Sequence, residues 1–129
     1  MKNDLTNISL LVVDDSPINQ RVVSMAMRST IKNIESAGNG LEAFHKYCET
    51  HYDVIVMDGR MPVMDGYEAT RKIRQYEKEN GIEKAVLIIA LTGSDTEQET
   101  DICLNAGMDA CMLKPFRIHE FIEILKDFN

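Results

Sequence analysis

The sequence predicts an α/β domain in which a doubly wound parallel sheet of five strands carries helices on both faces. Two patterns support this prediction. Short apolar runs, rich in β-branched residues, alternate five times with segments in which apolar residues recur at the helical period. Strict alternation of strand and helix produces a parallel sheet, because right-handed crossovers return each strand to the same sheet. With 129 residues the chain has the length of one ordinary domain, so we expect residues 1–129 to form a single domain.

The first half of the chain supplies three predicted strands, at 8–13, 33–37 and 53–57. Ser16 and Pro17 predict the start of the first helix, because serine is a preferred N-cap and proline is tolerated at the first helical position. The residues that form an apolar face on that helix are Ile18, Val22, Met25 and Ala26. A Gly-Asn-Gly turn precedes the second helix, whose apolar residues are Leu41, Ala43, Phe44 and Tyr47.

The second half of the chain repeats the alternation. We expect a third helix from Asp65 to about Tyr76, with Ala69 and Ile73 pointing inward and Gly81 stopping the helix soon after. Two further strands are predicted at 85–91 and 110–113, on either side of a more polar helix at 96–105 that ends at Ala106 and Gly107. The last helix has an apolar stripe made of Ile118, Phe121, Ile122 and Leu125.

The composition limits the function classes. A formal net charge of −7 argues against a general nucleic-acid binder, which needs a basic surface to neutralise phosphates. The three cysteines are odd in number and form no C-x-x-C pair, which indicates reduced thiols. The N-terminus lacks the apolar core of a signal peptide, and the longest apolar run, 85–91, is far too short to span a membrane. We therefore expect a soluble, cytoplasmic protein, or the soluble part of a membrane-anchored chain; the initial Met1 favours a stand-alone protein.

Reactive side chains follow the predicted strands. In chain order they are Asp14, Asp15, Asp58, Thr92 and Lys114. In a doubly wound sheet, ligands bind at the carboxyl ends of the strands, so these groups are expected to face one crevice. Clustered carboxylates raise each other's pKa values unless a cation lies among them, and oxygen-only ligands select Mg²⁺ or Mn²⁺. A lysine and a hydroxyl beside such an ion are suited to a phosphoryl group, and a carboxylate can itself be the nucleophile.

Each of these residues also has a plainer interpretation. Asp15 could simply favour the positive N-terminus of the first helix. Asp58 could be an acid that ends a strand, and Lys114 a solvated surface lysine. Thr92 alone is an ordinary strand-end residue, and we interpret Asp65 only as a helix cap. The joint occurrence of the set at four strand ends favours the functional interpretation.

These residues and their flanks resemble the response-regulator receiver domain of two-component signalling, the CheY-like fold. The resemblance covers essentially the whole chain, through "LLVVDDSPINQ", "NGLEA", "VIVMDGRMPVMDGYEATRKIR", "IIALTG" and "AGMDACMLKP". The segments "MPVMDGYEATRKIR" and "AGMDA" are similar to those in receivers of hybrid histidine kinases and phosphorelays. The resemblance implies a flavodoxin-like sheet with strand order 2-1-3-4-5.

The resemblance also implies roles. Asp58 would accept the phosphoryl group, and Asp14, Asp15, Asp58 and the backbone carbonyl of Arg60 would hold Mg²⁺. Thr92 would bind the phosphoryl oxygen, Lys114 would pair with the phosphoryl group, and the Lys114–Pro115 peptide would be cis. The donor would be a phosphohistidine on a histidine kinase or phosphotransfer protein, and the output partner would use the face made by the fourth helix, fifth strand and fifth helix. Self-phosphorylation and slow self-dephosphorylation would not make the protein an enzyme in the turnover sense.

Two positions depart from the family pattern. Cys111 stands three residues before the lysine, where the family usually has an aromatic residue that swings inward; we hypothesise weak coupling to the output face, unless Met112 or Phe116 supplies the bulk. Cys111 is equally well interpreted as an ordinary small core residue. Arg60, two residues after the acceptor, is either a partner of the phosphoryl oxygens or a solvent-facing cation. Ser94 stands two residues after Thr92, and Gly59 is expected to leave room for the phosphoryl group.

The sequence lacks the motifs that other functions of this fold would need. A flavodoxin would need a Ser/Thr-rich phosphate loop where this chain has the acidic "DDSPIN", and no P-loop or G-x-G-x-x-G is present. An aspartate-nucleophile phosphatase would need its acid after the first strand and a cap domain, for which the chain has no length. A receiver that no longer accepts phosphate usually lacks one of the acids or the lysine, and this sequence keeps them all.

Overall fold

The computed structural model describes residues 7–94 and 96–128 and shows strict alternation of strands and helices. The strands are β1 (Ser9–Val13), β2 (Asn33–Ala37), β3 (Val54–Asp58), β4 (Leu87–Thr92) and β5 (Ala110–Leu113). The helices are α1 (Pro17–Met27), α2 (Gly40–Glu49), α3 (Gly66–Glu79), α4 (Glu97–Ala106) and α5 (Ile118–Asp127). All paired strands are parallel and the order is β2-β1-β3-β4-β5, which confirms the predicted fold class.

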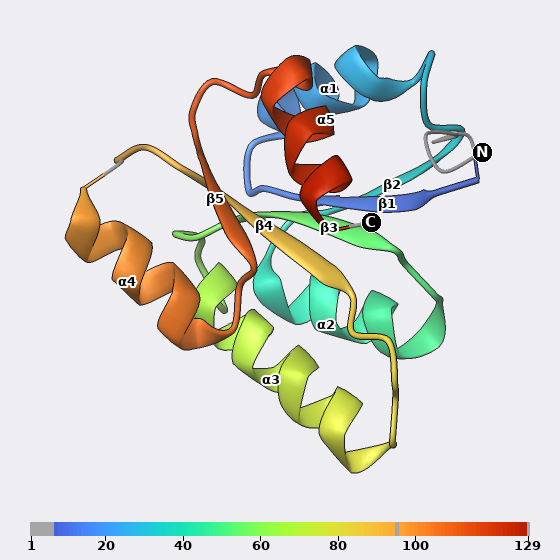
Figure 1. Cartoon of the computed structure of the whole chain (residues 1–129), viewed down its shortest axis with the longest axis vertical. Helices are drawn as coiled ribbons and strands as arrows, with labels where there is room; N and C mark the ends of the chain where they lie inside the picture. The colour runs from blue at the N-terminus through green and yellow to red at the C-terminus, as the bar shows by residue number, and fades with distance from the viewer. Residues whose placement is uncertain (1–6, 95, 129) are drawn as a thin grey trace.

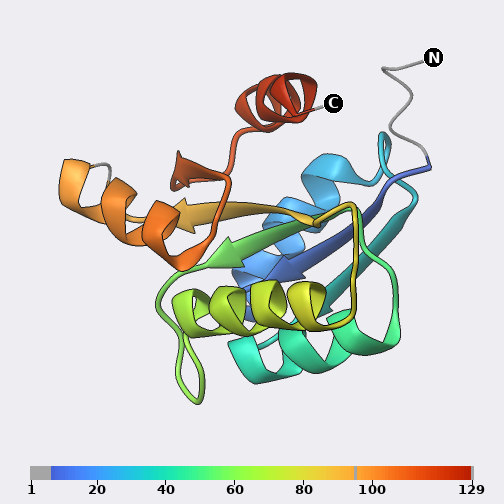
Figure 2. The ribbon, with the colours of Figure 1, turned by 60° about the horizontal axis from the view of Figure 1, so that its bottom comes forward.

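The sheet separates two apolar cores. Helices α1 and α5 cover one face, and α2, α3 and α4 cover the other (Figures 1 and 2). Successive residues of β1 alternate between the two cores: Leu11 and Val13 face α2 and α3, whereas Leu10 and Val12 face α1 and α5. A strand buried on both faces needs an apolar residue at every position, which explains the continuous apolar runs in the sequence.

Most element boundaries agree with the sequence to within two residues, but α3 extends three residues beyond the predicted Tyr76, to Glu79. The reason is Glu77, which is buried and hydrogen-bonded, so the helix continues to a position where the sequence shows only charged residues. The expected caps are present: the Ser16 hydroxyl accepts a hydrogen bond from the Asn19 amide, and Gly81 has a left-handed φ of 62° just after the helix.

The expected apolar face of α1 is not the face that packs on the sheet. Ile18, Val22 and Met25 are 75%, 49% and 58% exposed, whereas Val23 and Met27 are buried. The side-chain amide of Gln20 donates hydrogen bonds to the backbone carbonyls of Asp14 and Ala37, at 2.7 and 3.2 Å. This tether, together with Val23 and Met27, fixes the rotation of the helix, so a polar residue lies on its inner side and an apolar stripe faces outward.

A charged cluster lies where α3 approaches the amino end of β4. The Arg74 guanidinium donates to the Glu77 carboxylate at 2.9 Å, to the Asp109 carboxylate at 2.8 Å and to the backbone carbonyls of Gly107 and Val86. Glu77 also accepts hydrogen bonds from the Tyr47 hydroxyl at 2.7 Å and from the Val86 amide at 2.8 Å. In this Arg74 cluster both carboxylates lie beside the guanidinium. Because Tyr47 belongs to α2 and Val86 precedes β4, the cluster joins α2, α3 and the sheet.

Candidate functional site

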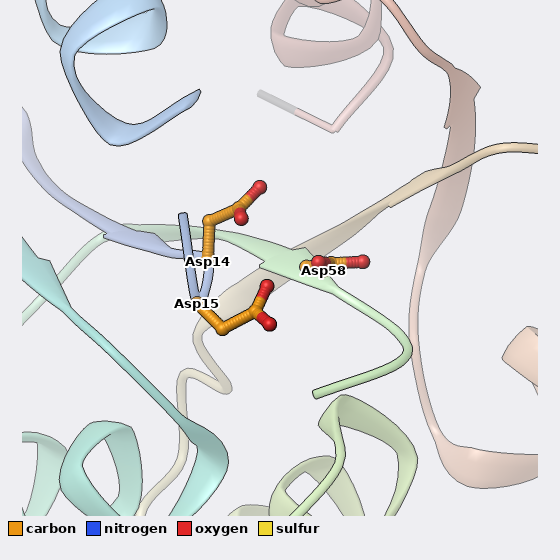
Figure 3. Close-up of side chains that lie close together, drawn as sticks. All are labelled: Asp14, Asp15 and Asp58. Atoms are coloured by element: carbon orange, nitrogen blue, oxygen red, sulfur yellow. The ribbon is translucent and has the colours of Figure 1, made fainter. Parts of the chain in front are cut away.

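Three carboxylates meet at the carboxyl edge of the sheet. Asp14 and Asp15 follow β1 directly, and Asp58 is the last residue of β3, the strand beside β1 (Figure 3). Each offers one oxygen, and these oxygens all lie within 4.8 Å of one another. The parallel register of β1 and β3 brings together residues that are more than forty positions apart in the sequence.

The start of α1 fixes the orientation of the first acid. The Ser16 amide donates a hydrogen bond to Asp14 Oδ1 at 2.9 Å. Asp14 is buried, whereas Asp15 is exposed on the outer side of the cluster. The turn that begins α1 therefore presents one carboxylate in a fixed position and the next one toward solvent.

Asp58 lies at the centre of the site and is 6% exposed. The Lys114 ammonium is 3.5 Å from Asp58 Oδ1, and the Arg60 amide lies 3.4 Å from the same oxygen. Burial raises the pKa of Asp58, the nearby Lys114 opposes this rise, and the charge of Asp14 adds to it. The site therefore holds more negative charge than its one lysine balances.

Thr92 and Lys114 complete the site from the next two strands. Thr92 is the last residue of β4, and its hydroxyl donates a hydrogen bond to the Ser94 carbonyl at 2.8 Å. Lys114 follows β5, and its amide donates to the Thr92 carbonyl at 2.6 Å. The Lys114–Pro115 peptide is cis, as the family resemblance implied. Both side chains line one cleft of about 210 Å³, which also borders Gly59 and Arg60.

Tyr67 and Glu99 also line this cleft, and neither was identified from the sequence as a residue of the site. The Arg60 guanidinium reaches Glu99 of α4 at 3.0 Å and lies over the Tyr67 ring, 5.7 Å from its centre. The Tyr67 hydroxyl donates a hydrogen bond to the other oxygen of Glu99. The sequence around Glu99 is polar and predicts a solvent-exposed helix, so it gives no indication that Glu99 is buried in the site.

Gly59, the residue after Asp58, lies against the side chain of Tyr67. A Cβ on Gly59 would lie too close to the Tyr67 hydroxyl, so the packing of Tyr67 favours a glycine here, and the role of Gly59 in access of the phosphoryl group stays a prediction. Asp65 is confirmed as the N-cap of α3: its Oδ1 accepts a hydrogen bond from the Glu68 amide at 2.8 Å. The acid that starts the helix and the acid that ends β3 therefore have separate roles.

Cys111 lies half-buried against the core under α3 and α4, close to Cys103. Burial and the neighbouring Cys111 thiol raise the pKa of Cys103 to about 12, which makes it an inert core thiol. Met112 and Phe116 pack in the other core, with α1 and α5, so neither fills the space beside Cys111. The suggestion that one of them replaces the missing aromatic residue is therefore wrong.

The chain matches the family model of the response regulator receiver domain over residues 10–126. It is 34% identical over 113 residues to the sensor histidine kinase RcsC of Escherichia coli K12, which covers 88% of this chain and 11% of RcsC. It likewise covers 11% of the hybrid signal transduction histidine kinase F of Dictyostelium discoideum. The chain therefore spans about a tenth of the length of these curated relatives.

Solved structures agree with this match. A complex of the Saccharomyces cerevisiae histidine phosphotransfer protein Ypd1 and the receiver domain of Ssk1 aligns with a TM-score of 0.89 and 31% identity, over 95% of this chain and 89% of that chain. The receiver domain of the sensor kinase PA1611 from Pseudomonas aeruginosa PAO1, with magnesium in its active site cleft, aligns with a TM-score of 0.78 and 36% identity, over 93% and 95% of the two chains.

The protein therefore belongs to the response regulator receiver domain family of two-component and phosphorelay signalling. Receiver domains are phosphoacceptors with weak self-dephosphorylation, and they bind Mg²⁺ in the active site. Within residues 7–94 and 96–128, no helix has the length and apolar character that a membrane crossing requires.

Proposed function

We propose that Asp58 is the phosphoacceptor of this receiver and that residues 1–129 act as one receiver domain in the cytoplasm. The observation that carries this proposal is the placement of Asp58: it is buried, has an oxygen within 4.8 Å of those of the other two acids, and lies 3.5 Å from the Lys114 ammonium. Asp14 is instead held by the turn of α1, and Asp15 is exposed. Of the three acids, Asp58 alone has the cation that a transferred phosphoryl group would need beside it.

In the proposed reaction an Asp58 carboxylate oxygen attacks the phosphorus of a phosphohistidine. An oxygen–phosphorus bond forms as the phosphorus–nitrogen bond breaks, and the electron pair returns to the imidazole nitrogen, which takes up a proton from solvent. Lys114 neutralises one phosphoryl oxygen, and the Thr92 hydroxyl turns from the Ser94 carbonyl to donate to another. Hydrolysis by water later returns Asp58 to its free form, so the protein is consumed and regenerated rather than acting as a turnover enzyme.

The residues present are suited to a hard divalent cation. The donors are oxygens only, from three carboxylates whose ligand atoms lie within 4.8 Å of one another, which favours Mg²⁺ or Mn²⁺ over Zn²⁺. Asp14, Asp15 and Asp58 would hold the ion, with the Arg60 backbone carbonyl as a further ligand. When bound, the ion supplies positive charge that neutralises the phosphoryl oxygens.

The phosphodonor is proposed to be a histidine kinase or a histidine phosphotransfer protein that docks on α1. The exposed apolar stripe of Ile18, Val22 and Met25 begins only three residues after Asp15, so a donor seated there brings its phosphohistidine to the acids. Val22→Lys is expected to slow transfer from a phosphorylated histidine phosphotransfer protein and to leave labelling by acetyl phosphate unchanged. Equal effects on both reactions would contradict this docking face. The output partner is proposed to use the α4–β5–α5 face, where Leu104 is half exposed.

Intact-mass spectrometry after incubation with acetyl phosphate tests the phosphoacceptor. The wild-type protein is expected to gain one phosphoryl group when Mg²⁺ is present and none when a chelator removes it. Asp58→Ala is expected to abolish the gain, and Asp65→Ala, which removes a helix cap of similar charge, is expected to retain it. An unlabelled wild type would favour a binding module that works without phosphorylation, and a labelled Asp58→Ala protein would place the acceptor elsewhere.

A further inference from the structure

Arg60, Glu99 and Tyr67 join the acceptor loop to the first turn of α4. Arg60 Nη2 is 3.0 Å from Glu99 Oε1, and the Tyr67 hydroxyl donates to Glu99 Oε2. Glu99 is fixed in turn by its helix, because its amide donates to the N-cap hydroxyl of Thr96 at 3.1 Å. A residue two positions after Asp58 is thereby attached to a helix that lies 39 positions further along the chain.

The two partners of this ion pair differ in freedom. The Glu99 side chain is 10% exposed and keeps the Tyr67 hydroxyl as a donor whether or not Arg60 is present. The Arg60 side chain is 73% exposed, so it can leave the carboxylate without disturbing the core. The exposed guanidinium can therefore turn toward a stronger anion, and Glu99 then keeps the Tyr67 hydroxyl as its hydrogen-bond donor.

Such an anion would form in the same cleft. Arg60 and Glu99 line the cleft of about 210 Å³ that also holds Thr92 and Lys114, the groups proposed to bind the phosphoryl oxygens. A phosphoryl group carries nearly two negative charges at neutral pH, against one on Glu99, and a guanidinium binds phosphate through two parallel hydrogen bonds. Arg60 should therefore bind the phosphoryl group more strongly than it binds the Glu99 carboxylate.

We propose that Glu99 is a positioning residue that holds Arg60 on α4 while Asp58 is unmodified, and that phosphorylation transfers Arg60 from Glu99 to the phosphoryl group. This inference rests on the proposed role of Asp58. In the phosphorylated state Arg60 covers the phosphoryl oxygens and excludes the attacking water, so it prolongs the phosphoryl lifetime. Glu99 shortens that lifetime by competing for Arg60. The same exchange releases the acceptor loop from α4 and so connects the site to the helix without an aromatic residue at position 111.

The lifetime of the phosphoryl group on Asp58 can be measured in a set of variants labelled by acetyl phosphate in the presence of Mg²⁺. Glu99→Gln keeps the shape and an acceptor for Tyr67 but removes the charge, so the phosphoryl half-life should lengthen about threefold or more. Arg60→Ala should shorten the half-life by a similar factor, and the double variant should behave like Arg60→Ala, because Glu99 acts only through Arg60. Glu97→Gln, which removes an exposed charge from the same turn of α4, is the matched control and should match the wild type.

A second measurement follows the side chain itself. The Arg60 Nε–H resonance should shift when beryllofluoride and Mg²⁺ are added to the wild type. In the Glu99→Gln protein this resonance should start from a different position, because Arg60 is already free of α4, and should reach the wild-type position after addition. Unchanged half-lives in both single variants, or a double variant that differs from Arg60→Ala, would overturn the proposal. A static Arg60 resonance in the wild type would also overturn it. A wild-type protein that gains no phosphoryl group would instead refute the role of Asp58, so the two failures are distinct.

Discussion

The sheet carries charged clusters at both of its edges, and they are built in opposite ways. At the amino edge, the Arg74 guanidinium lies between Glu77 and Asp109, and Glu77 accepts two further hydrogen bonds. At the carboxyl edge, three carboxylates lie together, and the cation beside them, Lys114, is 3.5 Å from Asp58. The Arg74 cluster places its cation between both of its carboxylates, whereas the cluster at the carboxyl edge crowds three carboxylates together with a lysine beside one of them.

This difference separates structural from functional charges. A buried charge whose partners all come from the same chain stabilises the fold, and removing one partner leaves another unpaired. A buried group of like charges is costly by itself and persists where a ligand of opposite charge binds. Removing a charge should therefore destabilise the fold at the amino edge and stabilise it at the carboxyl edge, and Mg²⁺ should stabilise the fold through the carboxyl edge.

The largest effect is expected at the Arg74 cluster. Arg74→Met should lower the free energy of unfolding by about 3 kcal/mol, because it leaves buried Glu77 without its cation. Denaturation by urea measures this change. Arg71→Met, on the exposed side of the same helix, is the control and should change stability little. Equal losses in the two variants would show that the Arg74 cluster contributes nothing specific.

The cluster at the carboxyl edge should respond to the metal ion. Binding of Mg²⁺ to the folded state should raise the free energy of unfolding by about 2.7 kcal/mol when its concentration is a hundred times the Kd. Asp15→Asn should reduce this gain, and Arg74→Met should retain it at a lower starting stability. A Mg²⁺ effect that survives Asp15→Asn undiminished would place the ion away from the three carboxylates.

Without the metal ion, Asp58→Asn should stabilise the fold by roughly 1 kcal/mol at neutral pH, because it removes one of the crowded charges. The sign follows from the raised pKa of Asp58: the ionised group is disfavoured in the folded state. The cost is absent below the pKa of the unfolded chain, where both states are protonated, and develops as the pH rises through the folded pKa. Melting at acidic and neutral pH measures this change, and destabilisation at neutral pH would contradict it.

The smallest effect is expected at alkaline pH. Burial and the hydrogen bond to Glu77 raise the pKa of Tyr47 above its usual value of about 10, so the unfolded chain loses this proton first. Stability that is present below pH 10 should fall as the pH rises further, by roughly 0.8 kcal/mol at about pH 10.5 for this one group. Tyr47→Phe should show a shallower decline, and identical pH profiles for the two proteins would show that Tyr47 ionises freely in the folded state.

Much of the acid site could be predicted from the sequence because strand ends are marked by a change in residue type. An apolar run that stops at Asp58 identifies both the strand and the group at its edge. The rotation of α1 could not be predicted, because that helix has two apolar stripes and the choice depends on Gln20 reaching the backbone carbonyls of Asp14, just after β1, and of Ala37 in β2. Glu99 could not be predicted either, because its burial depends on Arg60 and Tyr67 from a distant segment.

The central claim is that Asp58, rather than Asp14 or Asp15, takes the phosphoryl group. Borohydride reduces an aspartyl phosphate to homoserine, so tandem mass spectrometry of protein labelled with acetyl phosphate and then reduced locates the acceptor directly. Homoserine is expected at position 58 alone, and only when Mg²⁺ was present during labelling. Homoserine at position 14 or 15, or a labelled protein without homoserine at position 58, would contradict the account.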